Sequence, residues 1–447
     1  MDRLDKSFLR KGVFWLPESD GHKLSGELRF DQNNGINLAL HGVLLHTESP
    51  RLIYGILEGK ACTLFKSYQK STLAHYGSGG TQQLSEYSAN YVFLGAHFDP
   101  ETETHPVMLV SFNHFDEWLH HIAFKYLPQT DNYKKIACFD PYPSPTARLD
   151  AINANLSIGH NVQMSGSSFS SMTWTGTVMF KVEPDSSQPF FFYFEDCVTH
   201  LQQLLTLLIG RPMFPTLIQI GKRNDYKDVL FAQPDADRQS NFSFVQMVIK
   251  YPEIQHLWPS VVANWFDNLQ KFESARTLLF GAIYFNHNVE LYFLTLIQAL
   301  ESYSRSAGSA HYMAEEDYRT QVYATVVKAI PSGIDDSLRE SLKNKLKYGN
   351  EFSLRKRLKL LFEQIPPDLL NLVRFSDPNI ISVLVNNRNY LTHYTDELKL
   401  HYVKPLALWV LAKGMETILL YLFFQAAGVP DNKFMAQFKQ ERRVFFS

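Results

Sequence analysis

The chain has 447 residues, of which 45% are hydrophobic, 20% charged and 14% aromatic, and its formal net charge is −2. This composition excludes a disordered or collagen-like protein, and the length predicts two or three domains with separate cores. A chain this close to neutrality that binds a polyanion must concentrate its cations locally, so clusters of charge are more informative than the total.

From Val13 to about Phe194 the sequence consists of short alternating or β-branched runs separated by Gly, Pro, Asn and Asp. These features are typical of strands, and Asn33-Asn34-Gly35 between two such runs predicts a hairpin turn. A helical pattern follows at 195–212, and the runs "TLIQIGK" and "SFVQMVIKY" are predicted to be strands. We therefore expect a β-rich domain over residues 1–250.

After Pro252 the sequence changes to long amphipathic segments with few helix breakers. The spacing of apolar residues predicts an α-helical bundle over residues 251–447, which makes the whole chain an α+β multidomain protein. The predicted helices cover residues 258–280, 288–306, 315–328, 354–362, 379–396 and 403–425.

The apolar run 405–428 is long enough to cross a membrane, but it carries Lys413 and Glu416 near its middle. Charges at that depth are costly in lipid, so this run is predicted to be a core helix, and we expect no membrane partner. The first twenty residues carry charges throughout and lack the apolar centre of a secretory signal. We expect a cytoplasmic protein.

Two groups of residues carry side chains of the types that bind metal ions. The cysteines Cys62, Cys138 and Cys197 lie far apart and form no CxxC pair, which indicates neither a disulfide framework nor a zinc module. The stretch "NHFDEWLHH", with His114, Asp116, His120 and His121, lacks the spacing of a known metal-binding motif. The sequence therefore predicts neither a metal nor another cofactor.

Residues 339–359 hold eight Lys or Arg residues and only two acidic ones. In "SLRKRLKLLF" the apolar residues are expected to form a buried stripe, which leaves the basic side chains facing water. Such a face is either ordinary solvated surface or a phosphate-contacting patch that binds RNA. The candidate RNA-binding residues are Arg355, Lys356, Arg357 and Lys359.

The stretch "RNYLTH", Arg388 to His393, combines two groups suited to RNA cleavage. A histidine can move a proton at the 2′-hydroxyl or the leaving oxygen, and an arginine can stabilise charge gathering on phosphorus. A similar pair, Arg305 and His311, is predicted to lie on a loop because Ala-Gly-Ser interrupts the helix there. The Arg388 pair is expected within a helix, which would hold it more firmly.

This motif resembles the signature of the HEPN superfamily of α-helical ribonucleases, in which Arg and His are separated by four to six residues. The segments "FLTLIQALESYSR" and "NEFSLRKRLKLLF" are similar to the HEPN domain of ApeA-type abortive-infection proteins. Near the N-terminus, "FWLPESDGHKLSGELRF" and "INLALHG" resemble the β-rich domain of the same proteins.

The resemblance implies a metal-independent endoribonuclease that acts as a homodimer and halts growth when phage infection triggers it. It implies that Arg388 and His393 are catalytic, that Asn389 assists them, and that Glu301 is a polar neighbour of the site. The implied partners are RNA, with transfer RNA among the candidates, and a phage-derived protein trigger. Because the β-rich domain carries no catalytic set, we expect it to sense the trigger through loops such as "HYGSGGTQQ" and "HFDPETETH".

Three alternatives remain open on the sequence. Some HEPN domains bind a nucleotide or a protein partner without cleaving RNA, and a shared fold does not exclude that function. The helical half could serve only to dimerise a ligand-sensing protein. The β-rich domain could also deliver RNA instead of sensing a trigger.

Overall fold

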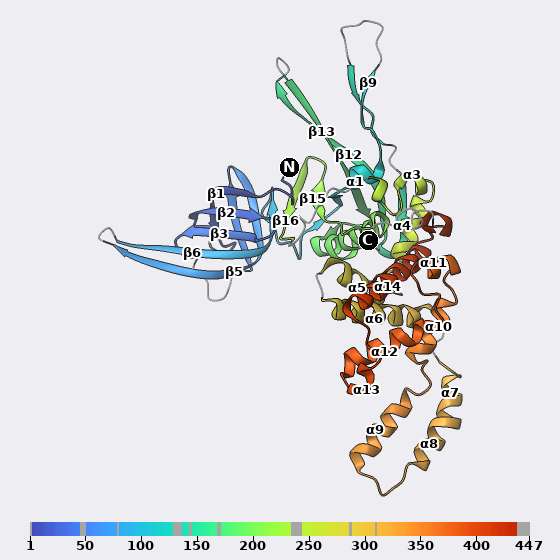
Figure 1. Ribbon diagram of the computed structural model, residues 1–447. Helices are drawn as coiled ribbons and strands as arrows, with labels where there is room; N and C mark the ends of the chain where they lie inside the picture. The colour runs from blue at the N-terminus through green and yellow to red at the C-terminus, as the bar shows by residue number, and fades with distance from the viewer. Residues whose placement is uncertain are drawn as a thin grey trace. The chain divides into compact units, whose positions relative to one another are not determined.

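The computed structural model describes residues 2–44, 51–77, 80–127, 136–142, 145–167, 171–233, 244–285, 288–308 and 311–435 (Figure 1). The chain divides into two compact units, Met1–Asp267 and Asn268–Ser447. The first is rich in strands and the described part of the second is helical, which confirms the α+β multidomain prediction.

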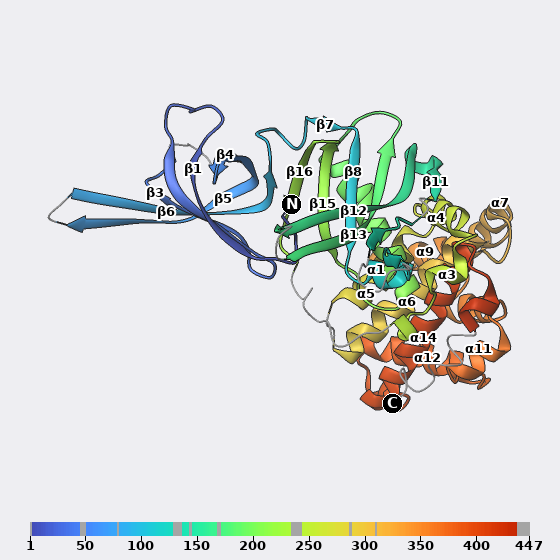
Figure 2. The ribbon, with the colours of Figure 1, turned by 90° about the horizontal axis from the view of Figure 1, so that it is seen from above.

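A closed barrel forms the first half of the N-terminal unit (Figure 2). Strand β6 pairs with both β3 and β5, so the antiparallel series β6-β3-β2-β1-β4-β5 returns to its own start. Closure leaves no unpaired strand edge along the ring. The strands are β1 (Phe8–Trp15), β2 (Leu24–Asp31), β3 (Gly35–His41), β4 (Leu52–Leu57), β5 (Lys60–Gly77) and β6 (Gly80–Leu94).

The turn between β2 and β3 confirms the predicted hairpin. The Asp31 carboxylate accepts hydrogen bonds from the backbone N–H groups of Asn33 (3.1 Å) and Asn34 (2.9 Å). Gly35 then adopts φ = 81°, a conformation that glycine reaches without steric cost. This local chemistry is why the turn was recognisable in the sequence.

The other half of the N-terminal unit continues from the same β6 strand, whose last residues pair with β16. Its strands follow in the order β16 (Asp225–Leu230), β15 (Pro215–Lys222), β8 (Val107–Phe112), β13 (Ser171–Pro184), β12 (Ala154–Ser167) and β11 (Thr146–Leu149). Two small pairs complete the described strands: β7 (Thr104–His105) with β14 (Gln188–Pro189), and β9 (Phe124–Leu127) with β10 (Ile136–Phe139).

Short helices pack on this second sheet, and Trp118 joins several of them. The ring of Trp118 lies 5.4 Å from that of Trp258 and 4.9 Å from that of Tyr251, and its Nε1–H donates to the Ile249 carbonyl at 2.8 Å. The helices are α1 (Phe115–Leu119), the π-helical η2 (Phe192–Val198), α2 (Thr199–Ile209), α3 (Tyr251–Ile254) and α4 (Trp258–Asp267).

The predicted strand "SFVQMVIKY" is wrong. Residues Phe244–Gln246 form a 3₁₀ turn, and the N–H groups of Val248 and Ile249 donate to the carbonyls of Ile209 and Leu208. Those two carbonyls lie at the end of α2, where helix geometry leaves them without helical partners. The apolar run therefore caps a helix that is distant in sequence.

The C-terminal unit is built around α14, the helix predicted from the apolar run. It is long and apolar enough to cross a membrane, yet most of it is buried against other helices, as expected of a core helix. Lys413 and Glu416 form an ion pair at 2.7 Å, and Tyr292 of α6 donates to the same carboxylate. The helices are α5 (Glu273–Tyr284), α6 (Val289–Ala307), α7 (Glu315–Asp317), the π-helical η4 (Tyr318–Tyr323), α8 (Ala324–Ala329), α9 (Asp336–Lys347), α10 (Leu354–Phe362), α11 (Pro367–Leu372), α12 (Ile380–His393), α13 (Asp396–Lys399) and α14 (Pro405–Ala426).

Four of the six predicted helices are confirmed within a few residues: 288–306, 315–328, 354–362 and 403–425. The helix predicted over 258–280 is interrupted after Asp267, where the two units divide. The helix predicted over 379–396 ends at His393 because Tyr394 takes the left-handed conformation. Helices α9, α11 and α13 were not predicted as separate helices; the apolar residues of α9 are Leu338, Leu342 and Leu346, four residues apart.

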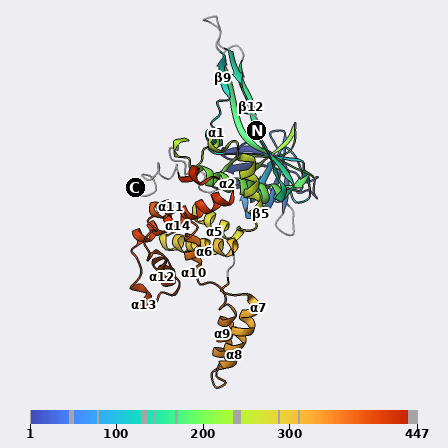
Figure 3. The same cartoon turned by 90° about the vertical axis from the view of Figure 1, so that its right-hand side faces the viewer.

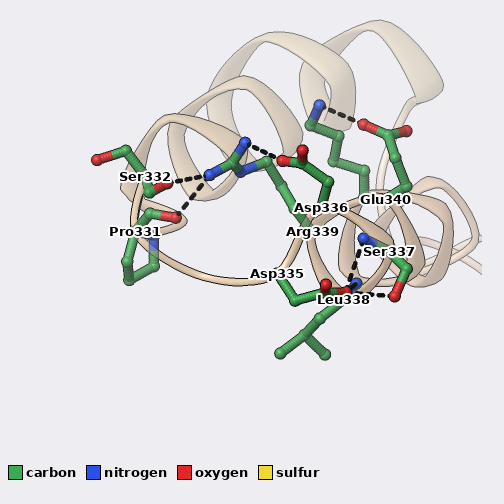
Figure 4. Close-up of polar contacts among 9 residues, drawn as sticks. Pro331, Ser332, Asp335, Asp336, Ser337, Leu338, Arg339 and Glu340 are labelled. Carbon is green, nitrogen blue, oxygen red and sulfur yellow. Dashed lines mark hydrogen bonds and ion pairs between the residues drawn. The ribbon is translucent and has the colours of Figure 1, made fainter.

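Helices α7 to α9 form an arm that extends away from the other helices of this unit (Figures 1 and 3). Of residues 311–349, all of which the structure describes, Tyr318 alone is buried. Asp335 caps α9 through the N–H groups of Ser337 and Leu338, and Arg339 contacts Asp336 and the Ser332 carbonyl (Figure 4). The arm therefore depends on local caps and ion pairs more than on a core.

Candidate functional site

The "RNYLTH" motif occupies the last turns of α12, and its polar residues lie outside the buried stripe of that helix. Ile380, Leu384, Asn387 and Leu391 form the buried stripe of this helix, at helical spacing. At about 100° per residue, Asn389 and His393 lie on the opposite side, and Arg388 and Thr392 lie on one flank of the stripe. Arg388 and Asn389 are half-buried there, and Thr392 and His393 are exposed.

Asn389 lies between the two predicted catalytic residues. Arg388 and His393 are five residues apart, about 140° around the helix axis, and Asn389 lies about 100° from Arg388 in the same direction. The Arg388 Nη1 group donates to the Asn389 Oδ1 atom at 3.3 Å. This contact draws the guanidinium toward the side of the helix that carries His393.

Asn387, which the sequence analysis did not single out, fixes the chain that follows the motif. It is fully buried, and its Nδ2 group donates to the carbonyls of Val383 (2.8 Å) and His401 (3.5 Å). Its Oδ1 atom accepts from the Val403 N–H at 2.9 Å. The sequence signal for this role is a polar residue at a position where the helical spacing of Leu384 and Leu391 predicts burial.

Of the predicted RNA-binding residues, Arg355 and Lys359 are exposed on α10, and Lys356 is half-buried beside them. The Arg355 Nη1 group donates to the Ser382 hydroxyl at 2.5 Å, which ties α10 directly to α12. Three cations therefore lie on the outer side of the helix that adjoins the motif helix.

Arg357 does not share that surface, so the expectation that it faces water is wrong. Its side chain is 1% exposed, its Nε group donates to the Phe352 carbonyl at 2.9 Å, and one Nη group contacts Glu351 at 3.3 Å. Burial lowers the pKa of Arg357. The nearby carboxylate draws this cation inward, where it packs at the base of the arm.

Glu301 belongs to the same ion network. Its Oε1 atom accepts from Arg305 at 3.0 Å, and Arg305 also donates to Glu351 at 2.6 Å. Among the described residues, no contact joins Glu301 to Arg388 or His393. The predicted role of Glu301 beside the catalytic pair therefore stays a prediction.

Arg305 and His311, the second Arg–His pair of the sequence, do not both lie on a loop as predicted. Arg305 lies in the last turn of α6, so its predicted position on a loop is wrong. His311 is exposed and pairs through its backbone with Glu351. The two residues between Gly308 and His311 lie outside the described part of the chain.

The N-terminal unit holds a polar cavity near the histidine stretch. Its volume is about 390 Å³, and Arg3, Asn113, His114, Asp116 and Thr177 are among its lining residues. Burial raises the pKa of Asp116, whose Oδ1 accepts the Val178 N–H at 3.0 Å, and lowers the pKa of His114. Across the described residues, no three His, Cys, Asp or Glu side chains converge as metal ligands.

The two proposed sensing loops differ in structure. The segment "HYGSGGTQQ" forms the paired ends of β5 and β6, with Gly77 opposite Gly80, and Ser78 and Gly79 lie outside the described residues. The segment "HFDPETETH" is a loop up to Glu103, in which Asp99 pairs with Arg51 at 2.8 Å, and its last two residues form β7. Glu103 in that loop is exposed.

Comparison with known protein families agrees with both halves of this description. Residues 9–265 match ApeA N-terminal domain 1, and residues 294–433 match the Apea-like HEPN domain. The chain belongs to the ApeA family. No curated protein and no solved structure matches it. An ApeA N-terminal domain joined to an Apea-like HEPN domain is the arrangement of an abortive-infection protein. HEPN domains are generally nucleases of the ribonuclease type. The HEPN match in this chain includes α12 and its motif.

We predict that Asn387→Ala lowers the free energy of unfolding by about 1–3 kcal/mol, because it leaves buried backbone groups without partners. Hydrogen exchange should rise at Val403, whose N–H the Asn387 side chain accepts. Thermal unfolding and exchange mass spectrometry measure the two effects. The neighbouring Asn386→Ala is the control and should change stability by less than about 0.5 kcal/mol; equal losses in both variants would contradict the assignment.

Proposed function

We propose that this ApeA-family protein is a cytoplasmic anti-phage effector that cleaves RNA without a metal ion. The observation that carries the proposal is that Arg388, Asn389 and His393 all lie outside the buried stripe of one packed helix, with Arg388 hydrogen-bonded to Asn389. The buried stripe of α12 holds the helix, so the polar groups project from a fixed support. The family match supports a nuclease of this class.

In the proposed reaction, His393 takes the proton from a ribose 2′-hydroxyl and, once protonated, gives a proton to the leaving 5′-oxygen. The 2′-oxygen attacks the adjacent phosphorus, and the P–O bond to the next nucleotide breaks. Arg388 stabilises the charge on the non-bridging oxygens, and Asn389 holds the guanidinium in place. The products are a 2′,3′-cyclic phosphate and a 5′-hydroxyl.

The cations Arg355, Lys356 and Lys359 on α10 are proposed to bind the RNA backbone next to this site. Contacts of this kind are to phosphate and carry little base specificity. Transfer RNA is one candidate substrate, because any RNA offers the same 2′-hydroxyl and phosphate groups.

We predict that Arg388→Ala and His393→Ala each lower RNA cleavage by about a hundredfold or more, because each removes a group that acts on the transition state. Single-turnover cleavage by purified protein is the measurement, with thermal unfolding to show that the fold persists. His401→Ala is the matched control, since His401 is an exposed histidine close to the same helix.

Arg305→Ala and His311→Ala should also retain cleavage, although Arg305→Ala removes two ion pairs and should lower stability. The assignment fails if His401→Ala or His311→Ala abolishes cleavage as completely as His393→Ala does.

We predict that a 2′-deoxy substitution at the cleaved nucleotide blocks the reaction, because the attacking oxygen is absent. Chelator should leave the rate unchanged, and mass spectrometry of the products should show cyclic phosphate ends. An absolute requirement for added magnesium or manganese would refute this mechanism.

A homodimer is proposed because Arg388 and His393 are too far apart around one helix to converge on a single phosphate. Two copies that place their motifs in one cleft can pair the arginine of one chain with the histidine of the other. Mixing the inactive Arg388→Ala and His393→Ala proteins should then restore part of the activity. A mixture of Arg388→Ala with the double variant is the control, and a monomer of full activity in light scattering would exclude the dimer.

The N-terminal unit is proposed to keep the nuclease inactive until a phage-derived protein binds. A trigger shifts such an equilibrium only if it binds the active state more tightly than the inactive one. The exposed loop with Glu103 and the 390 Å³ cavity are surfaces on which that difference could arise.

We predict that Glu103→Lys reduces protection from phage by about tenfold in plaque assays, a size expected from a modest change in trigger affinity. Basal cleavage by the purified protein should stay unchanged. Glu18→Lys, at another exposed site of the same unit, is the control. If the β-rich unit delivers RNA instead, basal cleavage and RNA affinity should fall together in the Glu103 variant.

A further inference from the structure

We propose that the exposed ring of Tyr394 is a stacking platform for an unpaired base of single-stranded RNA. The proposal rests on the proposed ribonuclease function and adds a binding subsite next to it. Tyr394 directly follows His393, so a base on this ring brings its own phosphate to the solvent-facing side of α12.

The ring is held from one side and open on the other. Tyr394 is 65% exposed, yet its ring centroid lies 5.4 Å from that of Tyr390, four residues earlier. Tyr390 in turn lies 4.8 Å from the ring of Tyr402, whose hydroxyl donates to Glu290 of α6 at 3.2 Å. A chain of aromatic contacts therefore anchors Tyr394 to α6 while leaving its outer surface accessible.

The backbone of Tyr394 indicates that the side chain is not there for stability. The residue has φ = 52° and ψ = 37°, a left-handed conformation that is strained for a bulky side chain. Helices that end in this conformation usually place glycine at the position. Because the ring is mostly exposed, its burial returns little to offset the strain. Strained residues cluster at functional sites, so the conformation of Tyr394 supports a functional contact of its side chain.

The chemistry of an exposed aromatic ring that directly follows His393 in the chain fits single-stranded nucleic acid. Every nucleobase has a flat face that stacks on tyrosine, so binding of this kind tolerates any sequence. In a duplex those faces are covered by neighbouring base pairs, and the bases of loops and single strands are the ones available. Arg388 and the cations of α10 supply the phosphate contacts that a stacked base alone lacks.

The test measures binding without cleavage, using His393→Ala protein and a fluorescein-labelled single-stranded RNA in fluorescence anisotropy. Adding Tyr394→Ala should weaken binding by about tenfold, the loss typical of one stacked base. Tyr394→Phe should retain affinity because it keeps the ring. Tyr394→Gly should lose affinity as alanine does, without a lower melting temperature, because glycine relieves the backbone strain.

The matched control is Tyr348→Ala, which removes a ring that is 69% exposed at the end of α9 and should leave affinity unchanged. A blunt duplex of the same RNA should bind the Tyr394 variants and their parent equally. The proposal is overturned if Tyr394→Ala binds single strands normally, if phenylalanine fails to preserve binding, or if the parent binds no single-stranded RNA.

A change in oligomeric state with unaltered RNA affinity would assign the ring to a protein contact and also overturn the proposal. The outcomes remain separable from the nuclease proposal. Wild-type protein that binds through Tyr394 but never cleaves would refute the nuclease alone. Cleavage that survives a failed binding test would refute the platform alone.

Discussion

The buried stripe of α12 is the constraint on which the candidate site depends. Ile380, Leu384 and Leu391 commit one side of the helix to the core, so the polar motif residues lie outside that buried stripe. Asn387 adds a polar anchor in the same stripe and ties down the chain that returns from Tyr394 to Val403. The positions of Arg388 and His393 therefore follow from residues that do no chemistry themselves.

A second layer of support reaches α12 through α10 and the base of the arm. Arg355 contacts Ser382 on α12, and two residues later Arg357 is buried against Glu351. Burying a cation is costly unless it is paired and hydrogen-bonded, and both the Phe352 carbonyl and Glu351 serve that purpose. Because Glu351 also binds Arg305, its carboxylate connects the end of α6 to α10, and its backbone pairs with His311 at the start of the arm.

The N-terminal unit joins a closed barrel to a second sheet. Strand β6 does so by pairing with β3 and β5 in the barrel and with β16 beyond it. The polar cavity lies in the half that follows, beside His114 and Asp116. Burial beside this cavity raises the pKa of the Asp116 carboxyl and lowers the pKa of the His114 imidazole.

The sequence by itself determined the features that depend on neighbouring residues. The β2–β3 turn follows from Asn33, Asn34 and Gly35. The span of α10 follows from the spacing of its apolar residues and from Ser353, which caps it. The helical setting of "RNYLTH" follows from the apolar residues around it. Helix and turn geometry are short-range, so periodicity and capping residues report them directly.

Only the tertiary structure decided which partner each group would find across long stretches of chain. The burial of Arg357, the capping of α2 by Val248 and Ile249, and the double pairing of β6 all depend on groups brought together by folding. A basic residue on an amphipathic helix is expected to face water unless a carboxylate such as Glu351 offers it a buried partner. A short apolar run predicts a strand, but its N–H groups can instead donate to free carbonyls at the end of a distant helix, as those of Val248 and Ile249 do. The local sequence does not show where such carbonyls will lie.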